Sequence, residues 1–125
     1  MGRGGFTLIE VMIALVILSV AILGMGTLTA GLVKTTAVGD VTAAAIQLAE
    51  DRIEEVRIEP VYAKIDSLYA GTETGFPTLP GFTRTTEVVH YGGPGQSFDY
   101  KKITVTVEGP GLLAPVVRTV TVAAP

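Results

Sequence analysis

The sequence predicts an α+β protein in which one long N-terminal helix packs on a small three-stranded antiparallel sheet. Three patterns along the 125 residues lead to this prediction. Residues 6–33 carry no charge except Glu10, and residues 34–59 repeat apolar side chains at helical spacing. Residues 82–125 alternate between strand-like segments and Gly/Pro-rich turns. The chain length allows one small domain beyond the hydrophobic start.

Residues 6–33 form the first element, which is predicted to cross a membrane because it exceeds the roughly 20 apolar residues that span a bilayer. Arg3 and the N-terminal amine precede it, so the positive-inside rule places the N-terminus in the cytoplasm and Lys34 onward outside. A charge at the centre of such a helix costs roughly 2.5–3.5 kcal/mol for Asp, Lys or Arg. Glu10 therefore needs a partner of opposite charge, and it is the candidate functional residue of this segment.

The helix is predicted to continue through residues 34–59 to about Arg57 and to end before Pro60. One side of this half is apolar, so we expect it to be amphipathic. The apolar side consists of Val38, Val41, Ala45, Ile46, Ala49, Ile53 and Val56. Acidic residues on the other side, interleaved with Arg52 and Arg57, are interpreted as a solvated helix face and not as a metal site.

Residues 60–81 are predicted to be a connecting loop rich in glycine and proline, with a short helical turn within Tyr62–Tyr69. The sheet is predicted in residues 82–125, as two consecutive hairpins. Its strands are expected at Phe82–Tyr91, Tyr100–Glu108 and Val116–Ala123. The second half of the helix is the only element large enough to cover the apolar face of this sheet. Residues 34–125 would together form the globular domain outside the membrane.

Composition excludes several classes of function. The net charge of −3 and the scattered Lys and Arg give no basic surface, so no direct nucleic acid binding is expected. The chain has no cysteine, which excludes disulfides and thiol catalysis. It contains no phosphate-binding loop, nucleophile elbow or zinc-protease motif, and its one histidine, His90, lies in a strand pattern. We therefore expect no enzyme activity, no cofactor and no metal site.

The stretch Gly5-Phe6-Thr7-Leu8-Ile9-Glu10 before a long apolar run resembles the N-terminus of type IV pilins and of type II secretion pseudopilins. The resemblance implies that residues 1–5 are a leader peptide and that a prepilin peptidase cleaves between Gly5 and Phe6. It implies N-methylation of Phe6, and pairing of Glu10 with the free Phe6 amine of a neighbouring subunit. It also implies the lollipop fold of that family.

The implied partners are other pilin or pseudopilin subunits, the prepilin peptidase/methyltransferase, an inner-membrane assembly platform and membrane lipid. The implied location is the bacterial inner membrane, with the N-terminus cytoplasmic, and then a periplasmic or cell-surface filament. The segments Phe6–Ile17 and Gln47–Arg57 are most similar to minor pilin V and pseudopilin I. The absence of cysteine separates this chain from pilins with a C-terminal disulfide loop.

Three interpretations of function follow. The first is a minor type IV pilin that is incorporated into a filament or primes its assembly, and the second is a pseudopilin of a type II secretion system. The third, from another class, is a membrane-anchored periplasmic binding module, which would need neither cleavage at Gly5 nor Glu10. A secretory signal peptide cleaved near Ala21 is disfavoured by Glu10 and by the apolar residues that continue beyond Ala21.

Overall fold

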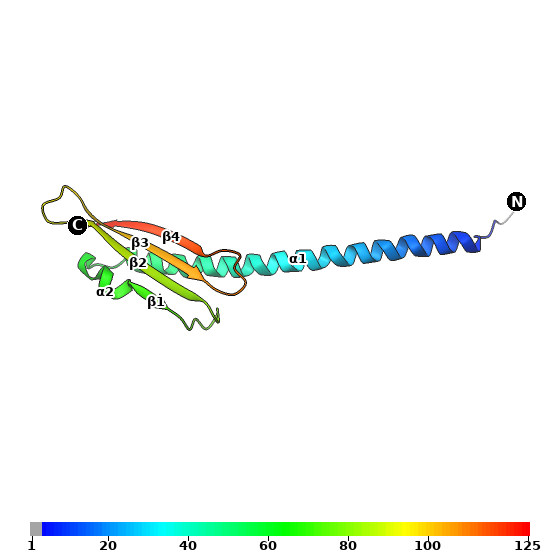
Figure 1. Cartoon of the computed structure of the whole chain (residues 1–125), viewed down its shortest axis with the longest axis horizontal. Helices are drawn as coiled ribbons and strands as arrows, with labels where there is room; N and C mark the ends of the chain where they lie inside the picture. Colours follow the sequence, from blue (N-terminus) through cyan, green and yellow to red (C-terminus); the bar gives the residue numbers. More distant parts are fainter. Residues whose placement is uncertain (1–3) are drawn as a thin grey trace. The chain divides into compact units, whose positions relative to one another are not determined.

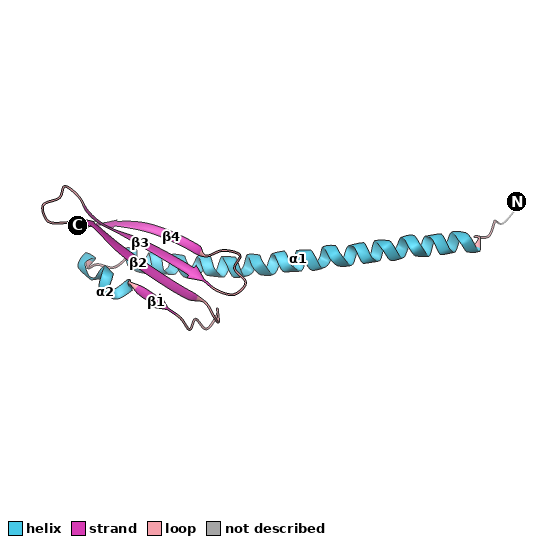
Figure 2. Cartoon of the chain, in the orientation of Figure 1, coloured by secondary structure: helices cyan, strands magenta, loops and turns pink. Residues whose placement is uncertain are grey.

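A computed structural model describes residues 4–125 and has an α+β fold (Figure 2). In chain order the elements are α1 (Leu8–Arg57), η1 (Tyr62–Lys64), α2 (Ile65–Tyr69), β1 (Gly71–Glu73), β2 (Thr83–Gly92), β3 (Asp99–Glu108) and β4 (Val116–Ala123). The strands form one antiparallel sheet in the order β1-β2-β3-β4 (Figure 1). The chain divides into two compact units, Met1–Ala37 and Val38–Pro125.

Thr7 fixes the start of α1. The backbone amide of Glu10 donates to Thr7 Oγ1 at 3.3 Å and to the Thr7 carbonyl at 3.1 Å. Thr7 is therefore the N-cap, and it satisfies an amide that the first helical turn leaves without a partner. The sequence predicted a helix from Phe6, whereas α1 begins at Leu8, because a capping residue itself has non-helical geometry.

In the unit Val38–Pro125, one side of α1 covers the inner face of the sheet, as predicted. This contact forms the core of the unit. Each fully buried Val, Ile or Phe side chain stabilises the fold by roughly 1.5–3 kcal/mol. The buried residues are Ala45, Ala49, Ile53 and Val56 of α1, Ile65 of α2, Phe82 immediately before β2, Ile103, Val105 and Val107 of β3, and Val116 of β4.

The predicted count of three strands is wrong, because the sheet has four. The additional strand, β1, lies in the segment predicted to be a connecting loop, and it pairs with Arg84–Thr86 of β2. With only three residues, β1 is too short to show the alternation by which strands are recognised, and its first residue is Gly71. The other three strands lie within one residue of their predicted bounds.

Two arginines tie α1 to the sheet. Arg52 of α1 and Arg84 of β2 are 7% and 6% exposed, and both pair with the Glu73 carboxylate of β1. Arg84 Nη1 also donates to the Leu48 carbonyl of α1 at 3.0 Å. The prediction that Arg52 lies on a solvated helix face is therefore wrong. Its guanidinium is buried because it meets a carboxylate from the strand that the sequence did not predict.

Candidate functional site

The predicted cleavage site lies immediately before α1. Residues 4–7 have no regular secondary structure and are exposed. A Cβ atom on Gly5 would meet no atom within 4 Å, and Gly5 is not among the glycines with positive φ. Nothing in the fold therefore requires glycine at position 5. A need for glycine there would come from recognition by another protein, as expected at a peptidase site.

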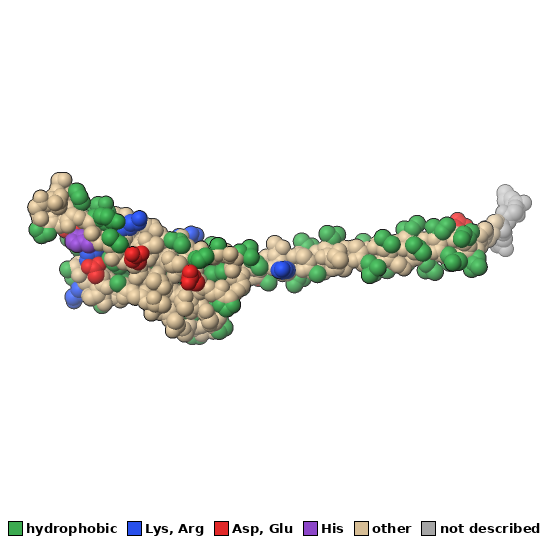
Figure 3. Space-filling model, in the orientation of Figure 1, with side chains coloured by type: hydrophobic (Ala, Val, Ile, Leu, Met, Phe, Trp, Pro, Cys, Tyr) green, Lys and Arg blue, Asp and Glu red, His purple; other side chains and the backbone are tan. Residues whose placement is uncertain are grey.

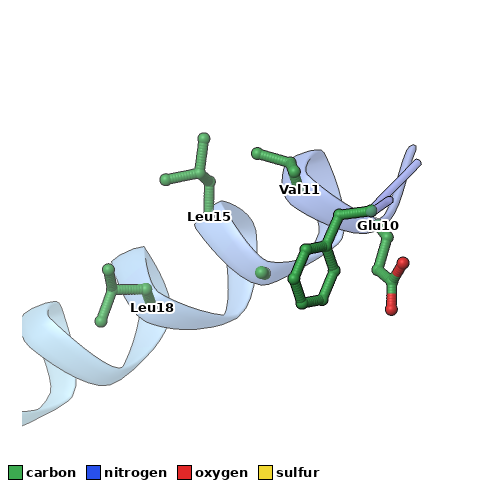
Figure 4. A pocket seen from close by; sticks show the side chains of 6 residues that line it. Glu10, Val11, Leu15 and Leu18 are labelled. Carbon is green, nitrogen blue, oxygen red and sulfur yellow. The ribbon is translucent and has the colours of Figure 1, made fainter. Parts of the chain in front are cut away.

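Glu10 occupies the third position of α1 and is exposed. Its carboxylate lies near the positive end of the helix dipole, a position that stabilises an anion by roughly 0.3–1 kcal/mol at a solvated surface. Within residues 4–125, Glu10 forms no ion pair. Figure 4 shows the carboxylate directed away from the apolar side chains of Val11 and Leu15. Its charge is thus available to a cation from outside this part of the chain.

The structure brings Phe6 and Glu10 to one surface. Together with apolar side chains of the next turns, they line a shallow recess of about 440 Å³ (Figure 4). The other lining residues are Val11, Ala14, Leu15 and Leu18. The Phe6 side chain is 83% exposed, so the residue that would become the new N-terminus is accessible. Backbone and side chains therefore leave both predicted site residues open to a second molecule.

The first part of α1 is suited to lipid or to neighbouring helices. An 18-residue window has a mean hydropathy of 2.7, and none of it is buried within the protein. Figure 3 shows hydrophobic side chains spaced along this segment. Its hydroxyl groups donate hydrogen bonds to backbone carbonyls of the preceding helical turn. Ser19 Oγ donates to the Leu15 carbonyl at 2.7 Å, and Thr29 Oγ1 donates to the Met25 carbonyl at 3.0 Å. The segment thus presents few unsatisfied polar groups to its surroundings.

A second group of titratable side chains joins η1 to the sheet. Asp99 Oδ1 accepts hydrogen bonds from Tyr62 Oη at 2.7 Å and from His90 Nε2 at 2.6 Å, and these bonds lower the pKa of Asp99. Burial, and then the bond to Asp99, raise the pKa of Tyr62 to about 12. Lys101, which is 3% exposed, pairs with Asp66 at 2.9 Å. Each of these side chains is paired with another group of the cluster. We therefore assign the cluster a structural role, which is to stabilise the fold.

Sequence reasoning missed one residue of the N-terminal site. Thr7 and Glu10 have the spacing of a capping box, Ser/Thr-x-x-Glu, in which the threonine caps the helix and the glutamate lies in its first turn. This pattern was present in the sequence and would have placed the helix start at Leu8. Glu10 is therefore compatible with helix initiation as well as with a contact between chains.

Comparison with known proteins supports the interpretation of the N-terminus. Residues 1–26 match the model of the prokaryotic N-terminal methylation motif. This match supports a type IV pilin-like protein, and it indicates a structural subunit that is processed by a prepilin peptidase and assembles with other subunits. No curated protein and no solved structure matches the chain.

Proposed function

We propose that this protein is a structural subunit of a pilus-type filament and, more specifically, a minor type IV pilin. The observation that carries the proposal is the methylation motif at residues 1–26, which includes the start of an apolar helix with no buried residue in its 18-residue window. A helix that buries nothing within its own chain gains stability from lipid first and from neighbouring helices after assembly. The pseudopilin of a type II secretion system is the second candidate, because the same motif serves both.

In this proposal, cleavage after Gly5 creates a cationic amine at Phe6, in the membrane beside Glu10. Both charges are poorly solvated there, and each lowers its free energy by pairing with an opposite charge. Glu10 of an incoming subunit pairs with the Phe6 amine of a subunit already in the filament, which sets the axial register of the two helices. The exposure of both residues on one surface supports this role.

The proposed location follows from the same elements. The N-terminus lies in the cytoplasm, residues 6–33 lie in the bacterial inner membrane, and the unit Val38–Pro125 lies in the periplasm. The inner-membrane assembly platform then moves the subunit into a filament. A membrane-anchored binding module would share this topology, but it would require neither cleavage after Gly5 nor an ion pair of Glu10.

Replacement of Glu10 tests the proposal. We expect the full-length Glu10→Ala variant to enter the membrane in wild-type amounts, because the span becomes more apolar. Its amount in sheared filaments should fall at least roughly tenfold, which corresponds to about 1.4 kcal/mol of lost pairing. Quantitative immunoblots of membranes and filaments measure both amounts.

Glu10→Asp is the matched control, because it retains the charge and should retain most of the incorporation. Wild-type incorporation of Glu10→Ala would rule out the role proposed for this carboxylate. Equal loss in the Asp and Ala variants would show that side-chain length, and not charge, matters at this position.

A further inference from the structure

The sheet ends in two edge strands that run in opposite directions. All neighbouring strands are antiparallel, and there are four of them, so β1 at one edge runs opposite to β4 at the other. Within residues 4–125 no strand pairs with the outer side of either one. Figure 1 shows β4 as the last strand on its side of the sheet. Open strand edges are templates for pairing with another chain.

Hydrogen-bond alternation identifies which residues of β4 face outward. The Ala124 amide donates to the Asp99 carbonyl at 2.9 Å, so this pair bonds toward β3. Alternate residues of an antiparallel strand bond to opposite sides, and therefore Thr119 and Thr121 direct their backbone groups away from β3. The Val117 carbonyl, of the same parity, is indeed free to accept a bond from Arg118 Nη1 at 3.1 Å.

The same alternation applies to β1. The Gly93 amide donates to the Phe98 carbonyl at 3.1 Å, which assigns odd-numbered residues of β2 to bonds with β3. Arg84 and Thr86 therefore bond toward β1, where they pair with Glu73 and Gly71. Thr72 lies between these two residues, so its backbone groups face outward.

The side chains at these open positions do not block pairing. Thr72, Thr119 and Thr121 are exposed and carry neither charge nor proline. Arg118, the charged residue of β4, is held back by Glu50 of α1 at 2.8 Å. Thr72 contacts Thr85 and Thr119 contacts Thr104, which places Thr72 and Thr121 on the same outer face of the sheet.

The direction of β4 relative to α1 determines which sheet edges of two copies can pair when their helices run in the same direction. Before β4, Gly111 lies beside Val41, and within β4 Arg118 pairs with Glu50. After β4, Asp99 joins the chain end to Tyr62, beyond the end of α1. β4 therefore runs in the same sense as the Val38–Arg57 part of α1. A two-fold β4–β4 pair would run these helices in opposite directions in the two copies.

We propose that the β4 edge of one copy pairs with the β1 edge of a neighbouring copy, so that Thr72 faces the outward residues Thr119 and Thr121. This antiparallel pairing runs the Val38–Arg57 parts of α1 in the same direction in the two copies. The contact is heterologous, so it can repeat from copy to copy without closing. It rests on the proposed function only for the shared membrane orientation.

Cross-linking in membranes tests the pairing, because the natural chain has no cysteine. Full-length Thr72→Cys and Thr121→Cys chains with different epitope tags are expressed together and treated with a short bis-maleimide. We expect the mixed product to exceed either same-tag product at least roughly fivefold, since only the heterologous pair brings these positions together. A Thr119→Pro change in the Thr121→Cys chain should reduce the mixed product, because it removes an outward-facing donor but no ladder bond.

The control pairs Thr72→Cys with Thr106→Cys, which lies on the interior strand β3 and should give no product. The inference is overturned if Thr121→Cys chains link mainly to each other, if they link to another protein, or if the mixed product does not exceed the control. Membrane fractions from the same cells separate the two proposals. A chain that is in the membrane without the mixed product overturns the pairing alone, whereas a chain absent from the membrane overturns the pairing and the proposed function together.

Discussion

Glu73 is the residue on which the contact between α1 and the sheet edge depends. Burial alone would raise its pKa, but hydrogen bonds and charges from Arg84 and Arg52 more than offset this, so the pKa of Glu73 is lowered from 4.5. Its carboxylate neutralises two arginines that are each at least nine-tenths buried. A buried charge without a partner is costly. Loss of this carboxylate should therefore lower the free energy of unfolding, because it leaves both arginines without their counter-charge.

A lowered pKa makes the contribution of Glu73 to stability depend on pH. The contribution is complete above the ordinary value of 4.5 and is lost as the pH falls through the lower native value. We therefore expect Glu73→Gln to lower the melting temperature at pH 7 by about 4–8 °C, for about 1 kcal/mol after allowance for solvent exposure. The difference from the natural chain should shrink as the pH falls below 4.5. Circular dichroism of the detergent-solubilised chain measures both melting temperatures.

Glu108→Gln is the matched control, because this exposed glutamate at the end of β3 has no ion pair within residues 4–125. Its melting temperature should follow that of the natural chain at every pH. A difference between Glu73→Gln and the natural chain that does not shrink as the pH falls below 4.5 would contradict the role assigned to the Glu73 charge.

At the scale of elements, β4 should respond to proline according to the side that each residue faces. Val120 bonds toward Ile103 of β3, so Val120→Pro removes a ladder bond and should cost about 1 kcal/mol or more. Thr119 faces the open edge, and Thr119→Pro should cost less than about 0.5 kcal/mol. Urea titration of the two full-length variants in detergent compares their free energies of unfolding. Equal losses would show that the assignment of inward and outward residues in β4 is wrong.

The long elements could be predicted from the sequence because their periodic patterns extend over many residues. The strands β3 and β4 alternate clearly, and Pro60 marks the end of α1. Two features were missed for physical reasons. β1 is defined by its pairing with β2 and not by its own three residues. The burial of Arg52 depends on a carboxylate that is distant in the sequence, which no local pattern reports.

The candidate site was predictable in a different way. Gly5, Phe6 and Glu10 stand together in a short motif, and the structure adds the helix cap at Thr7 and the exposure of all three. The partner expected for Glu10 lies on another molecule, so a single chain cannot supply it. The sequence indicates that Glu10 requires a partner, whereas the geometry of that contact is defined only in the assembled state.

At the scale of the whole molecule, the two units differ in what they bury. The unit Val38–Pro125 has its own core, which joins α1 to the sheet. Every described residue before Val38 is exposed, and this part of α1 is apolar enough to cross a membrane. Such a surface is stable only in lipid or against other helices. The methylation motif at residues 1–26 includes the start of this apolar part, and the filament subunit that we propose would account for both observations.

Mass spectrometry of the N-terminal peptide of the chain purified from its native cells tests whether the chain is processed as a filament subunit. We expect the mature chain to begin at Phe6 and its α-amine to be methylated. An intact Met1, or a mature end near Ala21, would contradict processing at Gly5 and with it the proposed filament subunit.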